Sequence, residues 1–493
     1  MPGAGARRGN PDTPAHGGNE SGAIRAAAAG FKRRDTCHEV SELKREPFRP
    51  LVSPRFNSLP FTATPPSLPA MLDIRLIREN ADFVKKRLAT RDASAVSAVD
   101  ELLDCDKKRR AAETIFQQLQ ADRKRVSKEI GGKRARGEET AAIEEEMRKL
   151  GAEIGRVEDE ARQLEAAQRT LLLNVPNLPH DGAPVGSSPE ENPVVRVWGE
   201  KPAFAFTLKS HIELGESLGL FDFERAVKIT GGAFAVYTGA GARLERTLIN
   251  FLLDLHTREH GYTEVSPPFL IKPETLVGTS QLPKFEDQLY RCERDELYLA
   301  PTAEVPVTNL HREEILRLDE LPIKYTAYTP CFRREAGSAG LGTRGLIRTH
   351  QFDKVELVKI TAPESSFAEL ESLTADAEKV LQLLGLHYRI VELCTGDLGF
   401  GSAKTYDIEV WAPGQNAYLE VSSCSNFADY QARRMGLRFK DAGGKNQFAH
   451  TLNGSGTALP RLFVALLENG QQADGTVRLP EPLHAAFGAT HLG

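Results

Sequence analysis

The sequence predicts an α+β fold, in which an N-terminal antiparallel two-helix coiled-coil arm precedes a domain built on a mostly antiparallel sheet. Three observations predict it. A heptad seam of apolar residues runs through residues 143–171. Glycines interrupt the helical pattern near residue 131. Downstream of a proline-rich stretch, strand patterns follow one another directly, with helices beside them.

Composition sets the first limits on function. The 493 residues, 40% of them hydrophobic, are enough for two or three domains. A net charge of −5 means that nucleic-acid binding would need a local basic patch. The six cysteines are scattered singly, without a C-x-x-C pair, so we expect free thiols in a cytoplasmic protein and no zinc. No run approaches the roughly 18 apolar residues of a membrane helix, so we expect no membrane partner.

The first 70 residues show no helical or strand period and are rich in proline, which is typical of a disordered segment. Their acidic residues contradict the acid-poor composition of a transit peptide. Periodic structure begins at Met71. We therefore expect residues 1–70 to be a disordered extension or the product of a misassigned start.

The arm is expected between Leu102 and Leu171, with Gly131, Gly132 and Gly137 at the turn. A limb of about 35 residues spans roughly 50 Å and must project from the body. The seam of the second limb is Ile143, Met147, Leu150, Ile154, Val157, Ala161, Leu164 and Leu171. The looser seam of the first limb is Cys105, Ala112, Ile115, Leu119 and Val126.

Positive charge gathers at the predicted tip of the arm, where Glu129 is the single acid between residues 123 and 136. Such a tip suits a phosphate backbone. The alternative is that these charges only solvate a coiled coil. The basic residues are Arg123, Lys124, Arg125, Lys128, Lys133, Arg134 and Arg136.

Prolines between residues 176 and 193 indicate a linker, placed at residues 181–200, before the sheet domain. Strands in direct succession favour an antiparallel sheet over a Rossmann arrangement. The expected strands are 325–335, 346–360, 388–394, 405–411 and 418–423. The expected helices are 243–260, 362–384 and 459–468.

Two pairs of residues suggest a binding site, although no G-x-x-x-x-G-K-[ST] phosphate loop is present. Arg333 and Glu335 are two apart in an expected strand, so both would point to one face, where they could hold a phosphate and an amine or metal. Phe352 and Glu356 also share one face and could form a floor for a base and an amino acid. Taken alone, each pair is more often a surface salt bridge or a core aromatic than part of a site.

A third segment, TLNGSGTALPRLFVALLEN, is interpreted as a glycine-rich turn that leads into a helix. Pro460 suits the first helical turn, and Arg461 beside it lies where a phosphate could be bound. The order of Pro268, the Arg333 region and Arg461 resembles the three signature motifs of class II aminoacyl-tRNA synthetases.

Longer strings resemble the bacterial seryl-tRNA synthetases, from Met71 through Asn469. They include HIELGESLGLFDFERA, PTAEVPVTNL, CTGDLGFGSAKTYDIEVW and EVSSCSNFADYQARRM. The resemblance implies a tRNA-binding domain with a long coiled-coil arm in residues 71–180 and a class II antiparallel-sheet catalytic domain in residues 201–493. It also implies a homodimer formed through the first motif. An apolar stripe on the helix before Pro268 fits that dimer: Leu244, Leu248, Phe251, Leu252 and Leu255.

The activity implied by this resemblance is the activation of L-serine with ATP, followed by transfer of serine to tRNA(Ser) and to tRNA(Sec). Two alternatives remain open. One is a paralogue that loads an amino acid onto a carrier protein; such proteins lack the long arm. The other is an inactive tRNA-binding paralogue, which would have lost an arginine or glutamate of the ATP site.

The resemblance also assigns roles to residues. Glu304 would hold the serine ammonium group, while Arg333 and Arg461 would be catalytic through their contacts with phosphate. Glu420 and Ser423 would hold Mg²⁺ that accompanies ATP. The serine site would comprise Thr302, Ala303, Glu304, Arg333, Glu356 and Ser455. The ATP site would comprise Arg333, Arg334, Glu335, Thr349, Phe352, Glu420, Val421, Ser422, Ser423 and Arg461. Either Arg333 or Arg334 could be the arginine that contacts the phosphate.

Overall fold

The computed structural model describes residues 72–336 and 345–493, and its centre is a sheet of eight strands. All neighbouring strands are antiparallel except one short parallel pair at the edge, so the predicted antiparallel sheet is confirmed. The expected extension at residues 1–70 lies outside the described residues. Across the sheet the strands are β1 (Val194–Trp198), β11 (Tyr388–Glu392), β12 (Lys404–Ala412), β13 (Ala417–Asn426), β16 (His450–Ala458), β10 (Gln351–Thr361), β9 (Ile323–Phe332) and β4 (Thr263–Glu264).

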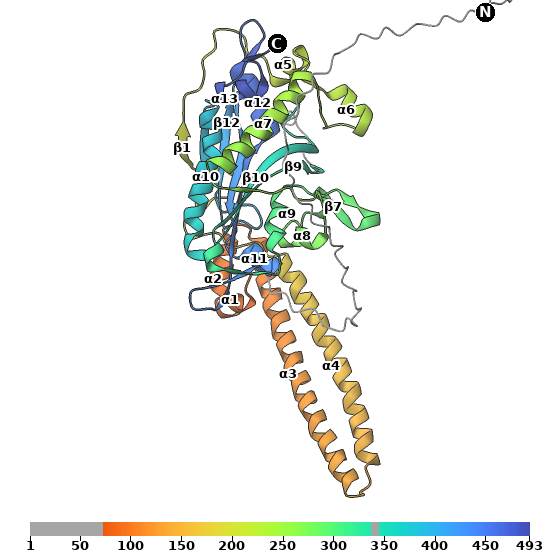
Figure 1. Cartoon of the computed structure of the whole chain (residues 1–493). Helices are drawn as coiled ribbons and strands as arrows, with labels where there is room; N and C mark the ends of the chain where they lie inside the picture. Colours follow the sequence, from red (N-terminus) through yellow and green to blue (C-terminus); the bar gives the residue numbers. More distant parts are fainter. Residues whose placement is uncertain (1–71, 337–344) are drawn as a thin grey trace, which may run out of the picture. The chain divides into compact units, whose positions relative to one another are not determined.

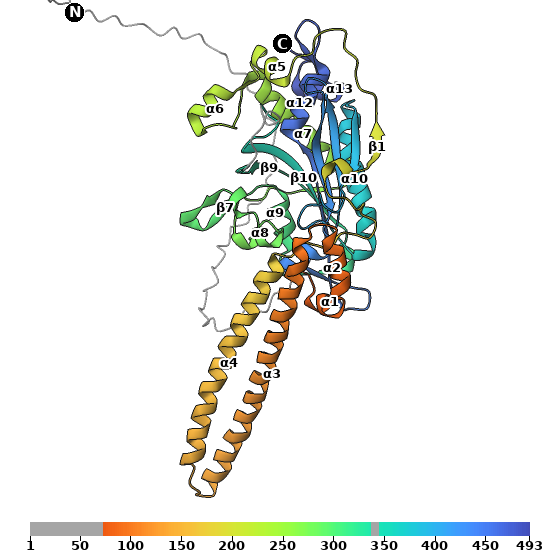
Figure 2. The ribbon, with the colours of Figure 1, turned by 180° about the vertical axis from the view of Figure 1, so that it is seen from behind.

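One face of the sheet is covered by α7 (Gly239–Arg258), α10 (Ser366–Leu383) and α12 (Leu459–Gly470). Their apolar side chains and those of the sheet form one continuous core. Figure 1 and Figure 2 show these helices beside the sheet from opposite sides. Strand β10 alternates as a strand must: Val355 and Leu357 enter this core, so residues of even number face the other way. That opposite face carries the candidate site.

The apolar stripe of α7 belongs to this core. Leu244, Leu248 and Leu252 are completely buried within the chain itself. The four leucines of the stripe therefore give no support to a dimer interface, because the protein's own sheet already covers them; Phe251 is only partly buried.

The predicted coiled coil is present as α3 (Ser94–Ala135) and α4 (Ala141–Leu173), which lie side by side and antiparallel in Figure 1 and Figure 2. Ile154 and Val157 of the predicted seam are buried. Ile115 is 51% exposed, so its place in the seam was wrong. Gly131 and Gly132 belong to the last turns of α3, and the chain reverses only afterwards, around Gly137. Gly137 has a φ of +72°, which favours glycine.

The base of the arm has a small core of its own with α1 (Ile74–Glu79) and α2 (Ala81–Ala89). Tyr430 of the short helix α11 (Tyr430–Met435) completes it. The buried carboxylate of Asp106 accepts hydrogen bonds from Arg78 at 2.8 Å and Gln168 at 3.0 Å. These contacts fasten both limbs of the arm to the small helices.

Four expected assignments differ from the structure. Residues 181–200 are more than a linker, because β1 joins the edge of the sheet there. Strand β9 ends at Phe332, before the predicted 335, and β10 starts at Gln351, after the predicted 346. Residues 451–458, expected to form a turn, lie within the central strand β16.

Glycines in β16 are explained by close packing of the helices above it. A Cβ on Gly454 would lie 2.4 Å from the Leu373 side chain of α10. A Cβ on Gly456 would lie 2.8 Å from the His256 ring of α7. A glycine-rich sequence here therefore marks a strand that two helices approach closely, and not a turn.

No helix in the described parts of the chain is long and apolar enough to cross a membrane. The five cysteines within those parts are all free thiols.

The glycine packing can be tested by substitution. Gly454→Ala should destabilise the sheet domain by about 1–3 kcal/mol, because the added methyl group meets Leu373 and Cys424 in a closed core. Urea unfolding followed by the fluorescence of Trp198 and Trp411, the only two tryptophans, measures this. Gly151→Ala on α4, where nothing lies within 4 Å of the new methyl group, is the control and should be neutral or mildly stabilising. Equal stability of the two variants would contradict the explanation.

Candidate active site

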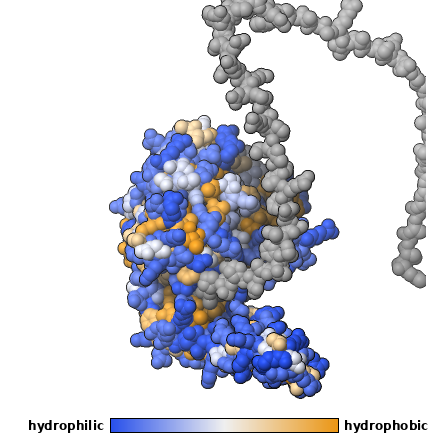
Figure 3. Space-filling model, turned by 60° about the horizontal axis from the view of Figure 1, so that its bottom comes forward, coloured by the Kyte–Doolittle hydropathy of each residue, from blue (hydrophilic) through white to orange (hydrophobic). Residues whose placement is uncertain are grey.

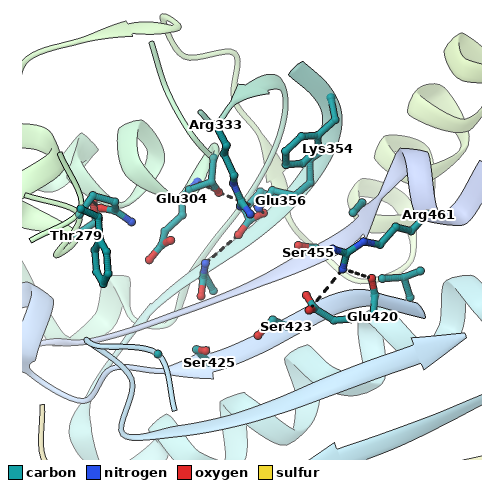
Figure 4. Close-up of a pocket in the computed structure, with 18 of the residues that line it drawn as sticks. Thr279, Glu304, Arg333, Lys354, Glu356, Glu420, Ser423, Ser425, Ser455 and Arg461 are labelled. Carbon is teal, nitrogen blue, oxygen red and sulfur yellow. Dashed lines mark hydrogen bonds and ion pairs between the residues drawn. The ribbon is translucent and has the colours of Figure 1, made fainter. Parts of the chain in front are cut away.

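A cavity of about 460 Å³ opens on the face of β10 that is turned away from α7 and α10. Figure 4 shows that strands far apart in the sequence converge on it. Twelve of the residues predicted for the serine and ATP sites line this cavity: Thr302, Glu304, Arg333, Glu335, Thr349, Phe352, Glu356, Glu420, Val421, Ser423, Ser455 and Arg461.

Three predicted residues lie outside the lining. Ala303 is completely buried in a small apolar cluster beside Val358. Ser422 is buried, and its hydroxyl donates a hydrogen bond to the Ser455 carbonyl at 2.6 Å. Arg334 is also absent from the lining, whereas Arg333 is part of it. Of the two adjacent guanidinium groups, the structure brings that of Arg333 to the cavity.

A buried charge cluster forms one end of the cavity. Glu356, 1% exposed, makes an ion pair with Lys354 and accepts a hydrogen bond from the Asn453 amide at 2.9 Å. The Lys354 ammonium also donates to the Thr302 hydroxyl at 2.8 Å. These contacts compensate the charges, because a buried charge without a partner costs several kcal/mol.

Glu304 lies beside this cluster at the start of the short helix α9 (Glu304–Thr308). Its Oε1 accepts a hydrogen bond from the Gln431 amide at 2.8 Å. Burial raises the pKa of Glu304 to about 7, and the nearby Glu356 carboxylate adds to the rise. Gln431, Lys354 and Arg333 oppose it. The cavity thus presents a carboxyl group that titrates near neutral pH.

Arg333 lies just past the end of β9, where its Nε donates to the Pro301 carbonyl at 3.2 Å. Its guanidinium lies 5.1 Å from the Phe352 ring, within the range of a cation–π contact. Glu335 has a left-handed backbone, with φ +48°, and accepts a hydrogen bond from Arg348 at 2.7 Å. The argument that a strand aligns Arg333 and Glu335 was therefore wrong, although both line the cavity.

Arg461, in the first turn of α12 as predicted, closes the other end. It donates to the Glu420 carbonyl at 2.7 Å, and its guanidinium lies 3.5 Å from the Glu420 carboxylate (Figure 4). Glu420 and Ser423 are three apart in β13, yet both line the cavity, because the strand has a bulge between its pairs at Ser422 and Glu420. The extra residue turns both side chains to one face.

The oxygens of Glu420 and Ser423 are of the type that Mg²⁺ prefers. Within residues 72–336 and 345–493, no group of three or more His, Cys, Asp and Glu side chains could hold a metal ion by itself. This set fits a magnesium ion that takes its remaining ligands from substrate phosphates and water, as Mg²⁺ commonly does. Asp407 pairs with Ser423 across the sheet, and burial together with Glu420 raises its pKa well above the usual range.

The sequence interpretation missed Lys354, Asn453 and Gln431. Lys354 stands between Phe352 and Glu356, so the same alternation that aligned those two could have found it. Asn453 was hidden because its strand was mistaken for a turn. Gln431 carries no local signal, since it reaches Glu304 across 127 residues of sequence.

Comparison with known proteins identifies the class first. Residues 285–470 match the tRNA synthetase class II core domain (G, H, P, S and T), which agrees with the antiparallel sheet and the cavity described above. The fold and this match define a class II aminoacyl-tRNA synthetase. Residues 71–179 match the seryl-tRNA synthetase N-terminal domain.

Individual relatives narrow the assignment. The chain is 60% identical over 419 residues to a serine–tRNA ligase of Akkermansia muciniphila, covering 85% of this chain and 98% of the relative. A solved seryl-tRNA synthetase of Pyrococcus horikoshii, complexed with ATP, superposes with a TM-score of 0.80 at 38% identity, over 85% of this chain and 99% of that one. The cytoplasmic serine–tRNA ligase of Naegleria fowleri, in complex with AMP, gives a TM-score of 0.76 at 28% identity, over 85% and 98%. The chain belongs to the seryl-tRNA synthetase family.

The charge cluster can be tested by a double-mutant cycle. Lys354→Met should cost about 3–5 kcal/mol of stability, because the Glu356 carboxylate would stay buried without its cation. Lys354→Met combined with Glu356→Gln should cost less than the sum of the single changes, by more than about 1 kcal/mol. Urea unfolding measures all three. The exposed pair Arg162 and Glu158 on α4 is the control, and Arg162→Met should cost less than about 1 kcal/mol. Strict additivity at residues 354 and 356 would contradict the buried pair.

Proposed function

We propose that this protein is a serine–tRNA ligase, which activates L-serine with ATP to seryl-adenylate and transfers serine to tRNA(Ser). The observation that supports it most is the division of one cavity into two ends. Glu304 and Glu356 at one end suit the ammonium and hydroxyl groups of serine. Arg461, with Glu420 and Ser423 at the other end, suits a triphosphate with its metal ion. Arg333 lies near Glu304, where the serine carboxylate and the α-phosphate would meet.

The reaction needs positioning and charge compensation more than proton transfer. The serine carboxylate attacks the α-phosphorus of ATP in line, forming a new P–O bond while the bond to pyrophosphate breaks. Arg333 would bind the serine carboxylate and the α-phosphate, and Arg461 the γ-phosphate. Phe352 would stack on adenine. Mg²⁺ held by Glu420 and Ser423 would offset the phosphate charge.

The arm supports tRNA as the second substrate. Its end comes forward in the lower part of Figure 3 and is predominantly hydrophilic. Arg125, Arg134 and Arg136 are exposed and pair with neighbouring acids. No ion pair in the described parts of the chain involves Arg123, Lys124 or Lys128, so these three cations are free to meet phosphate.

Three further expectations rest on the family resemblance: charging of tRNA(Sec), a homodimer and a cytoplasmic location. The dimer no longer has the α7 stripe as support. Exposed apolar residues on the neighbouring α6 (Phe223–Thr230), namely Val227 and Ile229, are 56% and 76% exposed and offer an alternative contact surface. Sedimentation of the wild type and of Ile229→Asp tests that surface.

Both rival functions are disfavoured. A ligase for a carrier protein would lack the long arm, which α3 and α4 supply here. An inactive paralogue would lack a charged residue of the ATP site, whereas Arg333, Glu420 and Arg461 all line the cavity.

Serine-dependent exchange of pyrophosphate into ATP tests the proposed activity. Serine should support exchange, and the other amino acids should support little. Arg333→Ala should lower kcat by about 10²–10³, because a group that binds the developing charge is lost. Arg334→Ala is the matched control, because Arg334 is adjacent in sequence but lies outside the cavity lining. The kcat of this variant should stay near that of the wild type. An equal loss in both variants would contradict the assignment of Arg333.

The arm should matter only for transfer. Replacing residues 108–161 with a short turn should leave serine activation largely intact and abolish charging of tRNA(Ser). Changing Arg123, Lys124 and Lys128 to Gln should flatten the salt dependence of tRNA binding by about one unit of slope for each lost phosphate contact. The control is a variant with Gln at three arginines that form intrahelical ion pairs further from the tip: Arg148, Arg156 and Arg162. An unchanged slope in the tip variant would mean that its charges only solvate the coiled coil.

A further inference from the structure

Helix α11 lies between the base of the arm and the cavity, and its Gln431 points toward the cavity floor without lining it. The side chain is 1% exposed. Its Nε2 donates to Glu304 at 2.8 Å, and its Oε1 accepts from the Thr451 hydroxyl at 2.7 Å. A buried amide with both ends engaged has one orientation.

Thr451 holds the end of the amide that points away from Glu304. It is completely buried on β16, and its hydroxyl meets the amide oxygen. The amide NH₂ faces the Glu304 carboxylate because an ionised carboxylate only accepts, and the amide oxygen is then left to accept from Thr451.

The rest of α11 is held against the segment that follows α4. The Tyr430 hydroxyl donates to the Val175 carbonyl at 2.5 Å, and Arg434 donates to the Leu173 carbonyl at 2.9 Å. Both side chains are buried, so the helix cannot shift without breaking these bonds. Gln431 is therefore presented to Glu304 from a fixed backbone.

We propose that Gln431 is a positioning residue, which keeps the Glu304 carboxylate ionised and aimed at the ammonium group of the amino acid. The proposal deepens the proposed function and rests on it, because it takes Glu304 as the ammonium ligand. Gln431 does not line the cavity, so its effect on the amino acid would pass through Glu304.

Electrostatics give the direction of the effect. The pKa of Glu304 is about 7, raised first by burial and then by Glu356, and lowered by the Gln431 hydrogen bond, by Lys354 and by Arg333. Because the pKa is raised, the carboxyl is protonated below about pH 7 and cannot compensate an ammonium charge. Loss of the Gln431 donor removes a contribution that lowers the pKa. The ionised form should then require a higher pH.

The test is the pH dependence of kcat/KM for serine in pyrophosphate exchange, between pH 6 and 9, for the wild type and Gln431→Met. In the wild type, kcat/KM should fall on the acid side of about pH 7. In Gln431→Met this acid limb should move up by about one pH unit, with a loss of up to about tenfold at pH 7 and recovery at high pH. The KM for serine should rise, and the KM for ATP should stay unchanged.

Two variants serve as controls. Thr451→Val keeps the Gln431 amide but removes the hydrogen bond that fixes its orientation. The acid limb of kcat/KM should therefore shift in the same direction by a smaller amount. This variant also replaces Gln431→Met in the test if Gln431→Met does not fold. Gln471→Met removes another buried amide, which bonds the backbone of Lys209 and Glu468 outside the cavity lining, and should leave the limb in place.

The outcomes separate the two hypotheses. A loss of kcat/KM in Gln431→Met by the same factor at every pH would overturn the proposal, because it would show a merely structural role. An unshifted acid limb would overturn it as well. Glu304→Gln tests the assignment beneath it: if that variant keeps the KM for serine of the wild type, Glu304 is not the ammonium ligand and the proposed site itself fails.

Discussion

The structure depends on one constraint, which is that the charged groups of the site are buried in the middle of a sheet and must compensate one another. Lys354 and Glu356 stand on β10, the strand between β9 and β16. Their remaining partners, Asn453 and Thr302, come from other elements. The cluster therefore forms only when the strands are in register, and a slip by one residue would place these charges in the apolar core.

Most charged residues of the arm are exposed to solvent, unlike those of the cavity. The ion pairs of the arm are exposed and mostly link residues three or four apart on one helix, so each contributes little to stability. Such charges can change partners at small cost, which suits a surface that meets a phosphate backbone. In the cavity, by contrast, the loss of one partner leaves a buried charge. The arm and the cavity thus contain the same charged residue types under opposite conditions of solvation.

Sequence patterns correctly predicted the helices and strands whose apolar residues repeat regularly along the whole element. The seam around Ile154 predicted the coiled coil, and alternation predicted β10 and the shared face of Phe352 and Glu356. The pattern failed at β16, where glycines report the close approach of α7 and α10 and resemble a turn signal. It failed too for Gln431, because contacts between distant segments leave no local period. Roles of individual residues came from family resemblance, and only their convergence on one cavity is visible in the structure.

Hydrogen bonds connect the N-terminal domain to the wall of the cavity. Arg91, after α2, is largely buried and donates to the carbonyls of Leu398 at 2.9 Å, Gly399 at 2.6 Å and Ser402 at 2.8 Å. Burial lowers its pKa to about 10, so it remains charged at neutral pH. Residues 399–402 line the cavity, which means that a cation from the N-terminal domain holds one wall of the site. The small helices at the base of the arm are therefore part of the structure that shapes the cavity.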